Sequence, residues 1–268
     1  MDKARWGEQI LRGCIPEAYL QGDRPLIVNF SGGKDSLVCL LLALKVTDNV
    51  ECMYMDAGFE LPSTLPYVRE RCKEFGLRLH VSHPERDRVK HRTIPDQVVN
   101  LVDYIRYYGY FPSKANRWCS IWCKQRPGRV YIRKVWGKEP LYKLVGVRQF
   151  DSAHRAVVYG PRGAAKYGGR YSRPDNEMIG CTLVYPILDW TTPEIWLYLM
   201  RNGIEMHEGY KLFGVSGCKW CPVHKPHTVA KIARALPGIY DDLLEAEHDI
   251  GKPAWQHERV WLKDVVGR

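Results

Sequence analysis

The sequence predicts an α/β fold in which a parallel sheet is flanked by helices in a Rossmann-like, three-layer arrangement, with a small C-terminal extension that contains cysteines. Three observations predict it. The chain has 268 residues, of which 45% are hydrophobic, and can therefore bury a full core. In its first part, short β-branched and aromatic runs alternate with segments of helical length. The gaps between them suit right-handed βαβ crossovers.

The elements of the first part follow from this alternation. The first apolar run ends in a glycine-containing loop, and the segment after the loop is apolar enough to be a buried helix. The pattern predicts, in order, a strand, a buried helix, a strand that ends before Asp56, an amphipathic helix and a third strand, at residues 26–30, 36–46, 51–55, 65–75 and 77–81.

The second part of the chain predicts two further strands, at residues 141–145 and 182–188. Residues 159–178 are rich in Gly, Arg and Tyr, and we expect a mobile loop or lid there. The expected organisation is a nucleotide-binding α/β domain at residues 1–203 and a C-terminal extension at 204–268.

A helix is predicted at residues 193–201, and both of its ends are marked. Thr191 and Glu194 have the spacing of a capping box, and Pro193 lies in the first turn. Gly203 follows the last turn, where helices commonly end.

The apolar runs are too short for a membrane helix. The longest one, near residues 37–44, is far below the ~20 residues that span a bilayer, and the N-terminal residues lack the apolar core of a secretion signal. We expect a cytoplasmic protein with no membrane partner.

The formal net charge of +10 favours polyanionic partners. Basic residues are densest at residues 117–138 and 162–173, which also carry aromatic residues. Interleaved cations and aromatic rings suit stacked bases and phosphates, so nucleic acid, such as tRNA or DNA, is a candidate partner. A basic solvated face is the alternative.

A phosphate-binding loop is predicted where the first strand meets the first helix. Two glycines let the backbone wrap closely around an anion, and the N-terminus of the following helix supplies unpaired N–H groups. The spacing is shorter than that of a Walker A sequence. The alternative is an ordinary Gly-Gly turn. The loop consists of Ser31, Gly32, Gly33, Lys34, Asp35 and Ser36.

Four segments resemble known proteins. The loop resembles the PP-loop of the adenine nucleotide alpha hydrolase-like superfamily, whose members act at the α-phosphate. Residues 55–65, 146–155 and 186–190 are similar, in the same order, to the Asp-Thr-Gly, Gly-Ile-Arg and Pro-Ile-x-x-Trp segments of the phosphoadenosine phosphosulfate (PAPS) reductase family. On this resemblance, the chain is identified as a member of that family.

The resemblance implies that the loop, with Asp56 and Gly146, binds ATP or a sulfonucleotide (PAPS or adenosine phosphosulfate). Asp56 also follows a strand, where an open parallel sheet exposes its ligand crevice. Two arginines would offset charge that accumulates on a pentavalent phosphate or sulfonate, with surface salt bridges as their alternative role. Mg²⁺ would bridge the departing pyrophosphate. Catalytic roles are implied for Lys34, Asp35, Arg148 and Arg155.

Four of the nine cysteines form two close pairs, Cys119 with Cys123 and Cys218 with Cys221. Each spacing lets two thiolates converge on one metal ion or cluster. Zinc and a [4Fe–4S] cluster both accept four thiolates. The remaining cysteines lie in apolar settings and are expected to be core residues: Cys14, Cys39, Cys52, Cys72 and Cys181.

The resemblance favours the iron–sulfur cluster over zinc. Adenosine phosphosulfate reductases and the Dnd-type DNA phosphorothioation proteins carry such a cluster. Cys123 stands where members without a cluster usually have an apolar residue. His224 and His227 are alternative ligands for one position.

Three functions are open. The leading hypothesis is an ATP pyrophosphatase, a transferase acting at the nucleotide α-phosphate, which adenylates a substrate for sulfur transfer and receives sulfur from a donor protein. The second is a sulfonucleotide reductase. Such reductases have a cysteine in a C-terminal tail, whereas no cysteine follows Cys221 here. The third is a non-catalytic, zinc-stabilised module that binds nucleic acid. The oligomeric state is not predicted.

Overall fold

The computed structural model describes residues 2–88, 90–166 and 169–267, apart from the side chain of Arg162. The chain packs as two compact units, each built from separate segments. The first unit comprises Met1–Tyr54, Pro66–His80 and Trp136–His207, and the second comprises Met55–Leu65, Val81–Val135 and Glu208–Arg268. The division into domains at 1–203 and 204–268 stays a prediction.

A six-stranded, mostly parallel sheet forms the centre of the first unit, with the order β3-β2-β1-β4-β6-β5. β1 pairs in parallel with β2 and β4, and β4 pairs in parallel with β6, whereas the edge strand β5 is antiparallel to β6. The strands are β1 (Leu26–Asn29), β2 (Val50–Met55), β3 (Arg78–Ser82), β4 (Leu141–Leu144), β5 (Ser172–Pro174) and β6 (Cys181–Val184).

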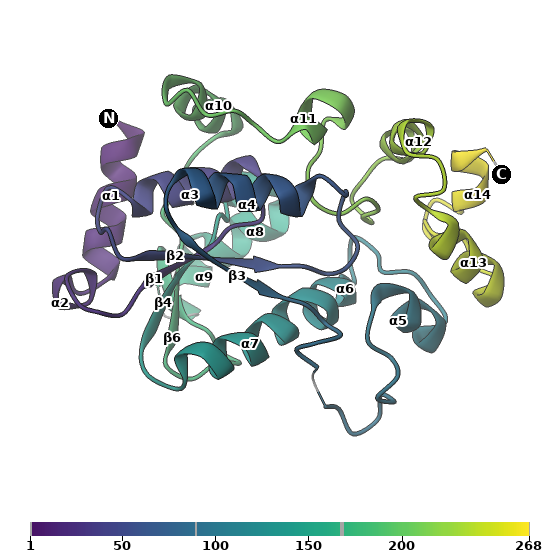
Figure 1. Cartoon of the computed structure of the whole chain (residues 1–268), viewed down its shortest axis with the longest axis horizontal. Helices are drawn as coiled ribbons and strands as arrows, with labels where there is room; N and C mark the ends of the chain where they lie inside the picture. Colours follow the sequence, from purple (N-terminus) through teal and green to yellow (C-terminus); the bar gives the residue numbers. More distant parts are fainter. Residues whose placement is uncertain (1, 89, 167–168, 268) are drawn as a thin grey trace. The chain divides into compact units, whose positions relative to one another are not determined.

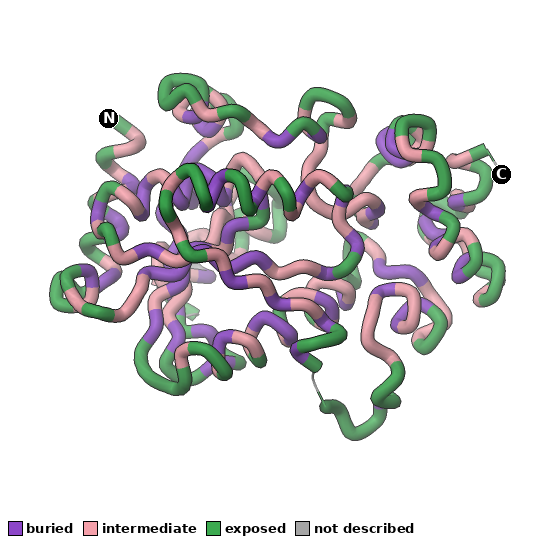
Figure 2. The backbone as a smooth tube through the Cα atoms, in the orientation of Figure 1, coloured by how far each residue is buried: buried purple, intermediate pink, exposed green. Residues whose placement is uncertain are grey.

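Helices cover this sheet. α1, α3 and α10 pack together, and α3 lies against β1 (Figure 1). Seven residues of α3 are buried, and Figure 2 draws the buried backbone in purple. The helices are α1 (Lys3–Cys14), α2 (Glu17–Leu20), α3 (Lys34–Ala43), α4 (Thr64–Glu74), α8 (Ala153–Tyr159), α9 (Pro161–Lys166) and α10 (Thr192–Arg201), with a 3₁₀ turn η2 (Gln149–Asp151).

Two sequence predictions about this unit are corrected. The strand predicted at 182–188 ends at Val184, because Pro186 has no N–H for a strand ladder and the chain turns while Ile187 and Leu188 stay buried. Residues 159–178, predicted as a loop or lid, contain α9 and β5, although residues 167–168 lie outside the described part.

Other predictions hold. The predicted capping box is present at the start of α10, where Glu194 Oε2 accepts from the Thr191 N–H at 2.7 Å. The cysteines predicted for the core are buried, except that Cys14 is only partly so.

The second unit is helical around an aromatic core that includes Trp118, Trp220 and Trp255. α13 packs against α5 and α14, and α12 packs against α14 (Figure 1). The helices are α5 (Leu101–Tyr108), α6 (Trp118–Ser120), the π-helical turn η1 (Ile121–Gln125), α7 (Arg126–Trp136), α11 (Glu208–Phe213), α12 (Pro226–Ala235), α13 (Asp241–Ile250) and α14 (Leu262–Val266).

Within the described part of the chain, no helix combines the length and the apolar character that crossing a membrane requires.

Candidate functional site

The predicted phosphate-binding loop joins β1 to α3 in the first unit. Gly32 has a positive φ of 75°, which favours glycine, and Gly33 precedes the first turn of α3. The Ser36 hydroxyl donates to the Gly33 carbonyl at 2.9 Å, and the Ser31 N–H donates to the Ser36 hydroxyl at 3.2 Å. The loop is thus held by its own hydroxyl groups at a helix N-terminus, where backbone N–H groups attract anions.

Gly146 follows β4 and lies directly against this loop. A Cβ at Gly146 would come within 2.9 Å of the Asp35 carbonyl carbon and 3.0 Å of the Ser36 nitrogen. Backbone therefore packs on backbone here, and a larger residue would displace the first turn of α3. The predicted contact of Gly146 with the nucleotide stays a prediction.

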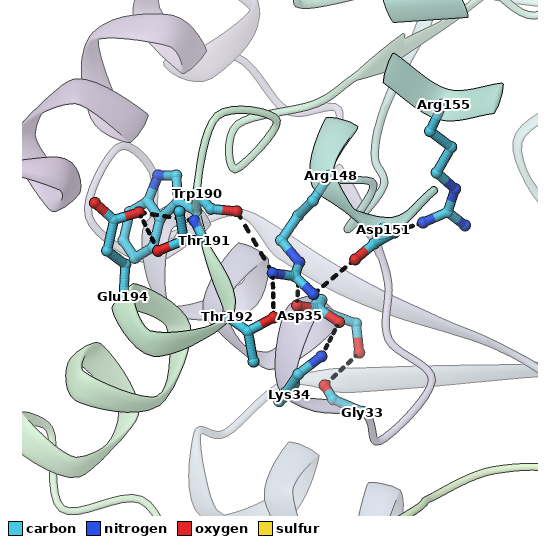
Figure 3. A network of polar contacts seen from close by, with 11 residues as sticks. Gly33, Lys34, Asp35, Arg148, Asp151, Arg155, Trp190, Thr191, Thr192 and Glu194 are labelled. Atoms are coloured by element: carbon cyan, nitrogen blue, oxygen red, sulfur yellow. Dashed lines mark hydrogen bonds and ion pairs between the residues drawn. The ribbon is translucent and has the colours of Figure 1, made fainter. Parts of the chain in front are cut away.

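Arg148 is the centre of an ion-pair network beside the loop (Figure 3). The residue is only 4% exposed. Its Nε lies 2.9 Å from Asp35 Oδ1, and its Nη2 lies 2.6 Å from Asp151 Oδ1. Its Nη1 donates to Thr192 Oγ1 at 2.9 Å, at the start of α10. Nη1 also donates to the Trp190 carbonyl at 3.5 Å. Burial and four partners make Arg148 a fixed part of the interior.

The network extends to both sides of Arg148 (Figure 3). The Lys34 ammonium lies 2.6 Å from Asp35 Oδ2, and Arg155 pairs with Asp151 from α8. Three cations against two carboxylates leave one formal positive charge beside the loop. All four residues predicted to be catalytic thus belong to one connected network.

Sequence reasoning did not select Asp151, Thr192 or Asp189. Asp151 lies three residues after Arg148 and four before Arg155, a spacing that could have indicated the pairing. Asp189 accepts from Gln149 Nε2 at 2.7 Å and from the Arg170 guanidinium and the Tyr171 hydroxyl, each at 2.5 Å. It therefore fixes the segment after Arg148 against the residues that lead into β5.

Asp56 lies in the second unit, at the end of β2. Its carboxylate accepts from the Gly58 N–H at 2.8 Å. Burial raises the pKa of Asp56, the Gly58 hydrogen bond opposes this, and the neighbouring Glu60 carboxylate raises it further. The structure shows a constrained acidic group here, and its contact with the nucleotide stays a prediction.

Glu60, which lies in the matched segment 55–65 but was not selected as a site residue, is a second centre of polar contacts in this unit. Its carboxylate accepts from the N–H groups of Ala57 at 3.1 Å and Phe59 at 3.0 Å, and lies 2.7 Å from the Lys124 ammonium. Burial alone would raise the pKa of Glu60, but the Lys124 charge outweighs it and the pKa is lowered. Glu60 therefore fixes the turn that follows Asp56.

Short strand-like pairing brings Cys218 opposite Glu60. The Leu61 N–H donates to the Gly217 carbonyl at 2.7 Å, and the Lys219 N–H donates to the Phe59 carbonyl at 2.9 Å. The Lys124 ammonium then lies 3.3 Å from Cys218 Sγ.

The four paired cysteines come together in the second unit. Electrostatic interactions link each thiol to two others: Cys119 to Cys123 and Cys221, and Cys218 to the same two. Burial, with the neighbouring thiols, raises the pKa of Cys119 to about 11 and that of Cys123 further. Burial also raises the pKa of Cys218 to about 12, although the Lys124 charge opposes it.

The four cysteines are suited to a metal ion or cluster that is held by four thiolates, because the two pairs, which are distant in sequence, lie near each other. The Lys124 ammonium beside Cys218 would offset thiolate charge. Across the described residues, however, no three His, Cys, Asp or Glu side chains already have the arrangement of metal ligands. Binding would therefore require the thiols to lose protons and move closer together.

The two histidines considered as alternative ligands differ in setting. Burial lowers the pKa of His224 to about 4, so its ring is neutral near pH 7, and its Nδ1 is buried with no hydrogen-bond partner among the described residues. His227 is exposed. Both remain untested as ligands.

Comparison with known proteins finds relatives of similar sequence. The chain is 26% identical over 257 residues to an uncharacterized protein of Methanocaldococcus jannaschii, covering 93% of this chain and 48% of that protein. It is 28% identical over 196 residues to the sulfate adenylyltransferase subunit 2 of Streptomyces lavendulae, covering 69% and 55%. The chain thus spans about half the length of these curated relatives.

A solved structure shows the same fold. The PAPS reductase of Candida auris, crystallised as a phosphate complex, aligns with a TM-score of 0.50 at 16% identity, over 79% of this chain and 87% of that one. The predicted fold class, an adenine nucleotide alpha hydrolase-like sheet flanked by helices, is confirmed. Residues 25–223 match the family model of the phosphoadenosine phosphosulfate reductase domain, and the chain belongs to that family.

Proposed function

We propose that this protein is an ATP pyrophosphatase that adenylates a substrate and thereby prepares it for sulfur transfer. The observation that carries the proposal is the Ser31–Ser36 loop at the N-terminus of α3, with the net positive Arg148 network beside it. Backbone N–H groups and fixed cations are the groups that bind a triphosphate and stabilise charge that develops at its α-phosphate.

The residues of the loop and of the Arg148 network have different roles in binding the triphosphate and stabilising the developing charge. The loop N–H groups and the Ser31 and Ser36 hydroxyls would hold the phosphate oxygens, with Lys34 as a point charge on them. Arg148 is held by two carboxylates and a threonine hydroxyl, so its guanidinium does not have to move as the reaction proceeds. Mg²⁺, bound through the pyrophosphate oxygens, would neutralise the leaving group.

The relatives support adenylyl transfer as the reaction class. One of them is a sulfate adenylyltransferase subunit, whose name describes transfer of an adenylyl group to an oxyanion. In the proposed reaction an acceptor oxygen attacks the α-phosphate, the bond to pyrophosphate breaks, and AMP leaves in a later displacement by sulfur supplied by a donor protein.

Product analysis tests this proposal. Full-length protein incubated with Mg²⁺, ATP, sulfide as the sulfur donor and candidate RNA or DNA acceptors should release AMP and pyrophosphate. Chromatography follows AMP with ATP labelled at the α-phosphate, and pyrophosphate with ATP labelled at the γ-phosphate in a parallel reaction. ADP and inorganic phosphate as the products would refute it.

A sulfonucleotide reductase is the second candidate, because the matched family model is described by that activity. It predicts sulfite release from PAPS or adenosine phosphosulfate in the presence of a thiol reductant. Sulfite release without ATP cleavage would replace the first proposal by this one.

We further propose that Cys119, Cys123, Cys218 and Cys221 hold a [4Fe–4S] cluster, or zinc in its place. A cluster there would supply a site for sulfide or electrons, while the Lys124 ammonium offsets thiolate charge at Cys218.

Substitution of one ligand should remove the metal. Cys218→Ser is expected to reduce bound iron and sulfide, or zinc, to a small fraction of the wild-type content, because a hydroxyl is a poor substitute for a soft thiolate. Elemental analysis and the visible spectrum of anaerobically purified protein measure this. Cys14→Ser, in the first unit, is the matched control and should keep the wild-type content. Wild-type metal content in Cys218→Ser would contradict the assignment.

A further inference from the structure

A small cavity lies in the second unit, beside the four-cysteine site. Its volume is about 150 Å³, and its walls include Tyr104, Trp122, Ile94 and Asp96, with Arg88 and Lys90 at its boundary. Cavities that enclose a drug-sized ligand measure roughly 300–1,000 Å³. This one therefore fits a single ring system better than a whole nucleotide.

Two aromatic residues, Tyr104 and Trp122, line the cavity. Trp122 and Tyr104 are stacked, with ring centroids 5.6 Å apart and an angle of 29° between their planes. The Arg126 guanidinium lies 3.8 Å from the Trp122 ring centroid, and His91 meets Trp122 edge-on at 5.2 Å. Planar cations and rings of this kind bind nucleobases through stacking and cation–π contacts.

A polar group is available at the same cavity. Asp96 is one of the residues that line it. Carboxylates accept hydrogen bonds from the exocyclic amino groups of bases, as they do with cytosine N4. The lining therefore combines stacking surfaces with an acceptor that a base edge can use.

The approach to the cavity is basic. Arg86, Arg88, Lys90 and Arg92 are exposed in the segment that lines it. Of the two acidic residues between Pro84 and Arg92, Glu85 is exposed, and Asp87 is buried and accepts from the His83 N–H at 2.9 Å. Four exposed cations therefore outnumber one exposed carboxylate. From Arg126 to Val135, within the second unit, the chain has four cations and no carboxylate. Such a run of cations exceeds what one mononucleotide needs and matches a phosphate backbone.

The cavity and the thiols share one backbone element. Trp122, Cys123 and Lys124 are consecutive in the π-helical turn η1. π-Helical turns are rare and occur frequently at functional sites. A base in the cavity would thus lie next to the turn that presents one of the four cysteines.

We propose that this cavity binds one unpaired base of a single-stranded nucleic acid, whose phosphates contact the basic residues around it. The inference names the substrate class of the proposed function. It rests on that function in one respect: the bound strand is taken to be the acceptor that is adenylated. Binding is measured without ATP, so a failure of catalysis and a failure of binding are distinguishable.

Fluorescence anisotropy of labelled single-stranded RNA and DNA oligonucleotides tests the proposal. Trp122→Leu should weaken binding roughly 5- to 150-fold, the range that stacking on one aromatic residue contributes. Trp122→Phe retains a stacking surface and should keep most of the affinity. Comparing the affinities for the RNA and the DNA oligonucleotides shows which of the two nucleic acids the protein prefers. Equal affinity of Trp122→Leu and wild type for both strands would overturn the proposal.

Variants that remove exposed cations test whether the ligand is a strand with several phosphates or a smaller molecule. Arg88→Ala with Lys90→Ala should reduce the slope of log affinity against log salt by about 0.7 for each phosphate that the variant no longer neutralises. Arg234→Ala, an exposed cation on α12, is the matched control and should leave the slope unchanged. A mononucleotide that competes as well as the full strand would refute a strand-binding site.

A crosslinking experiment on wild-type protein covers the case in which Trp122 variants misfold. Strands that carry 5-iodouridine should crosslink to peptides that contain Trp122 or Tyr104, identified by mass spectrometry. Crosslinks confined to other regions of the chain would overturn the assignment.

Discussion

Lys34→Ala should reduce ATP cleavage by ~100- to 1,000-fold, the loss typical when one preorganised electrostatic group at a developing charge is removed. The Lys34 ammonium is the cation of the loop itself, and Asp35 holds it 2.6 Å away at the first turn of α3. The measurement is kcat/KM for pyrophosphate release, with calorimetric ATP affinity alongside it. Unchanged turnover and affinity would remove the loop from the proposed site.

The fold should survive this change, which makes the test specific. Arg148 continues to pair with Asp35, so the free energy of unfolding should change by no more than about 1 kcal/mol, as for a partly exposed ion pair. Lys45→Ala is the matched control, because Lys45 follows α3 and pairs with Glu8, away from the loop. It should leave ATP cleavage unchanged.

Local signals explain why the first part of the fold could be predicted. The strand before the loop, the buried helix after it and the capping box of α10 depend on residues that are close in sequence. The prediction failed where a local signal was ambiguous. Residues 182–188 read as one apolar strand, yet Pro186 ends the ladder and the buried residues after it belong to a turn.

The site was predictable to a similar extent. The Ser31–Ser36 loop and the cysteine pairs have characteristic spacings, and the structure places the loop at a helix N-terminus and the four cysteines in one unit. Thr192 has no such signal, and the matched segment 55–65 does not single out Glu60. Glu60 meets Lys124 and Cys218 only because its backbone pairs with residues far along the chain. Pairing over such separations is set by tertiary structure, which a single sequence does not display.

Arg148→Ala should lower both stability and activity. Removing the cation leaves the Asp35 and Asp151 carboxylates close together with less compensation, and truncating one partner of a buried ion pair costs about 3–5 kcal/mol. We expect a value near the lower end, about 3 kcal/mol, because Lys34 and Arg155 remain beside the two acids. Thermal and urea unfolding followed by circular dichroism give the free energy of unfolding.

A double variant separates the structural role of Arg148 from its role toward the nucleotide. Arg148→Ala combined with Asp151→Asn removes one charge of each sign, so much of the lost stability should return, while pyrophosphate release should stay at the level of Arg148→Ala. Asp151→Asn alone keeps the arginine and is the control for the loss of the carboxylate. If the double variant regained wild-type turnover, Arg148 would serve only to balance the charges of Asp35 and Asp151, and its proposed action on the α-phosphate would be wrong. If turnover stays low while stability recovers, the guanidinium acts on the nucleotide.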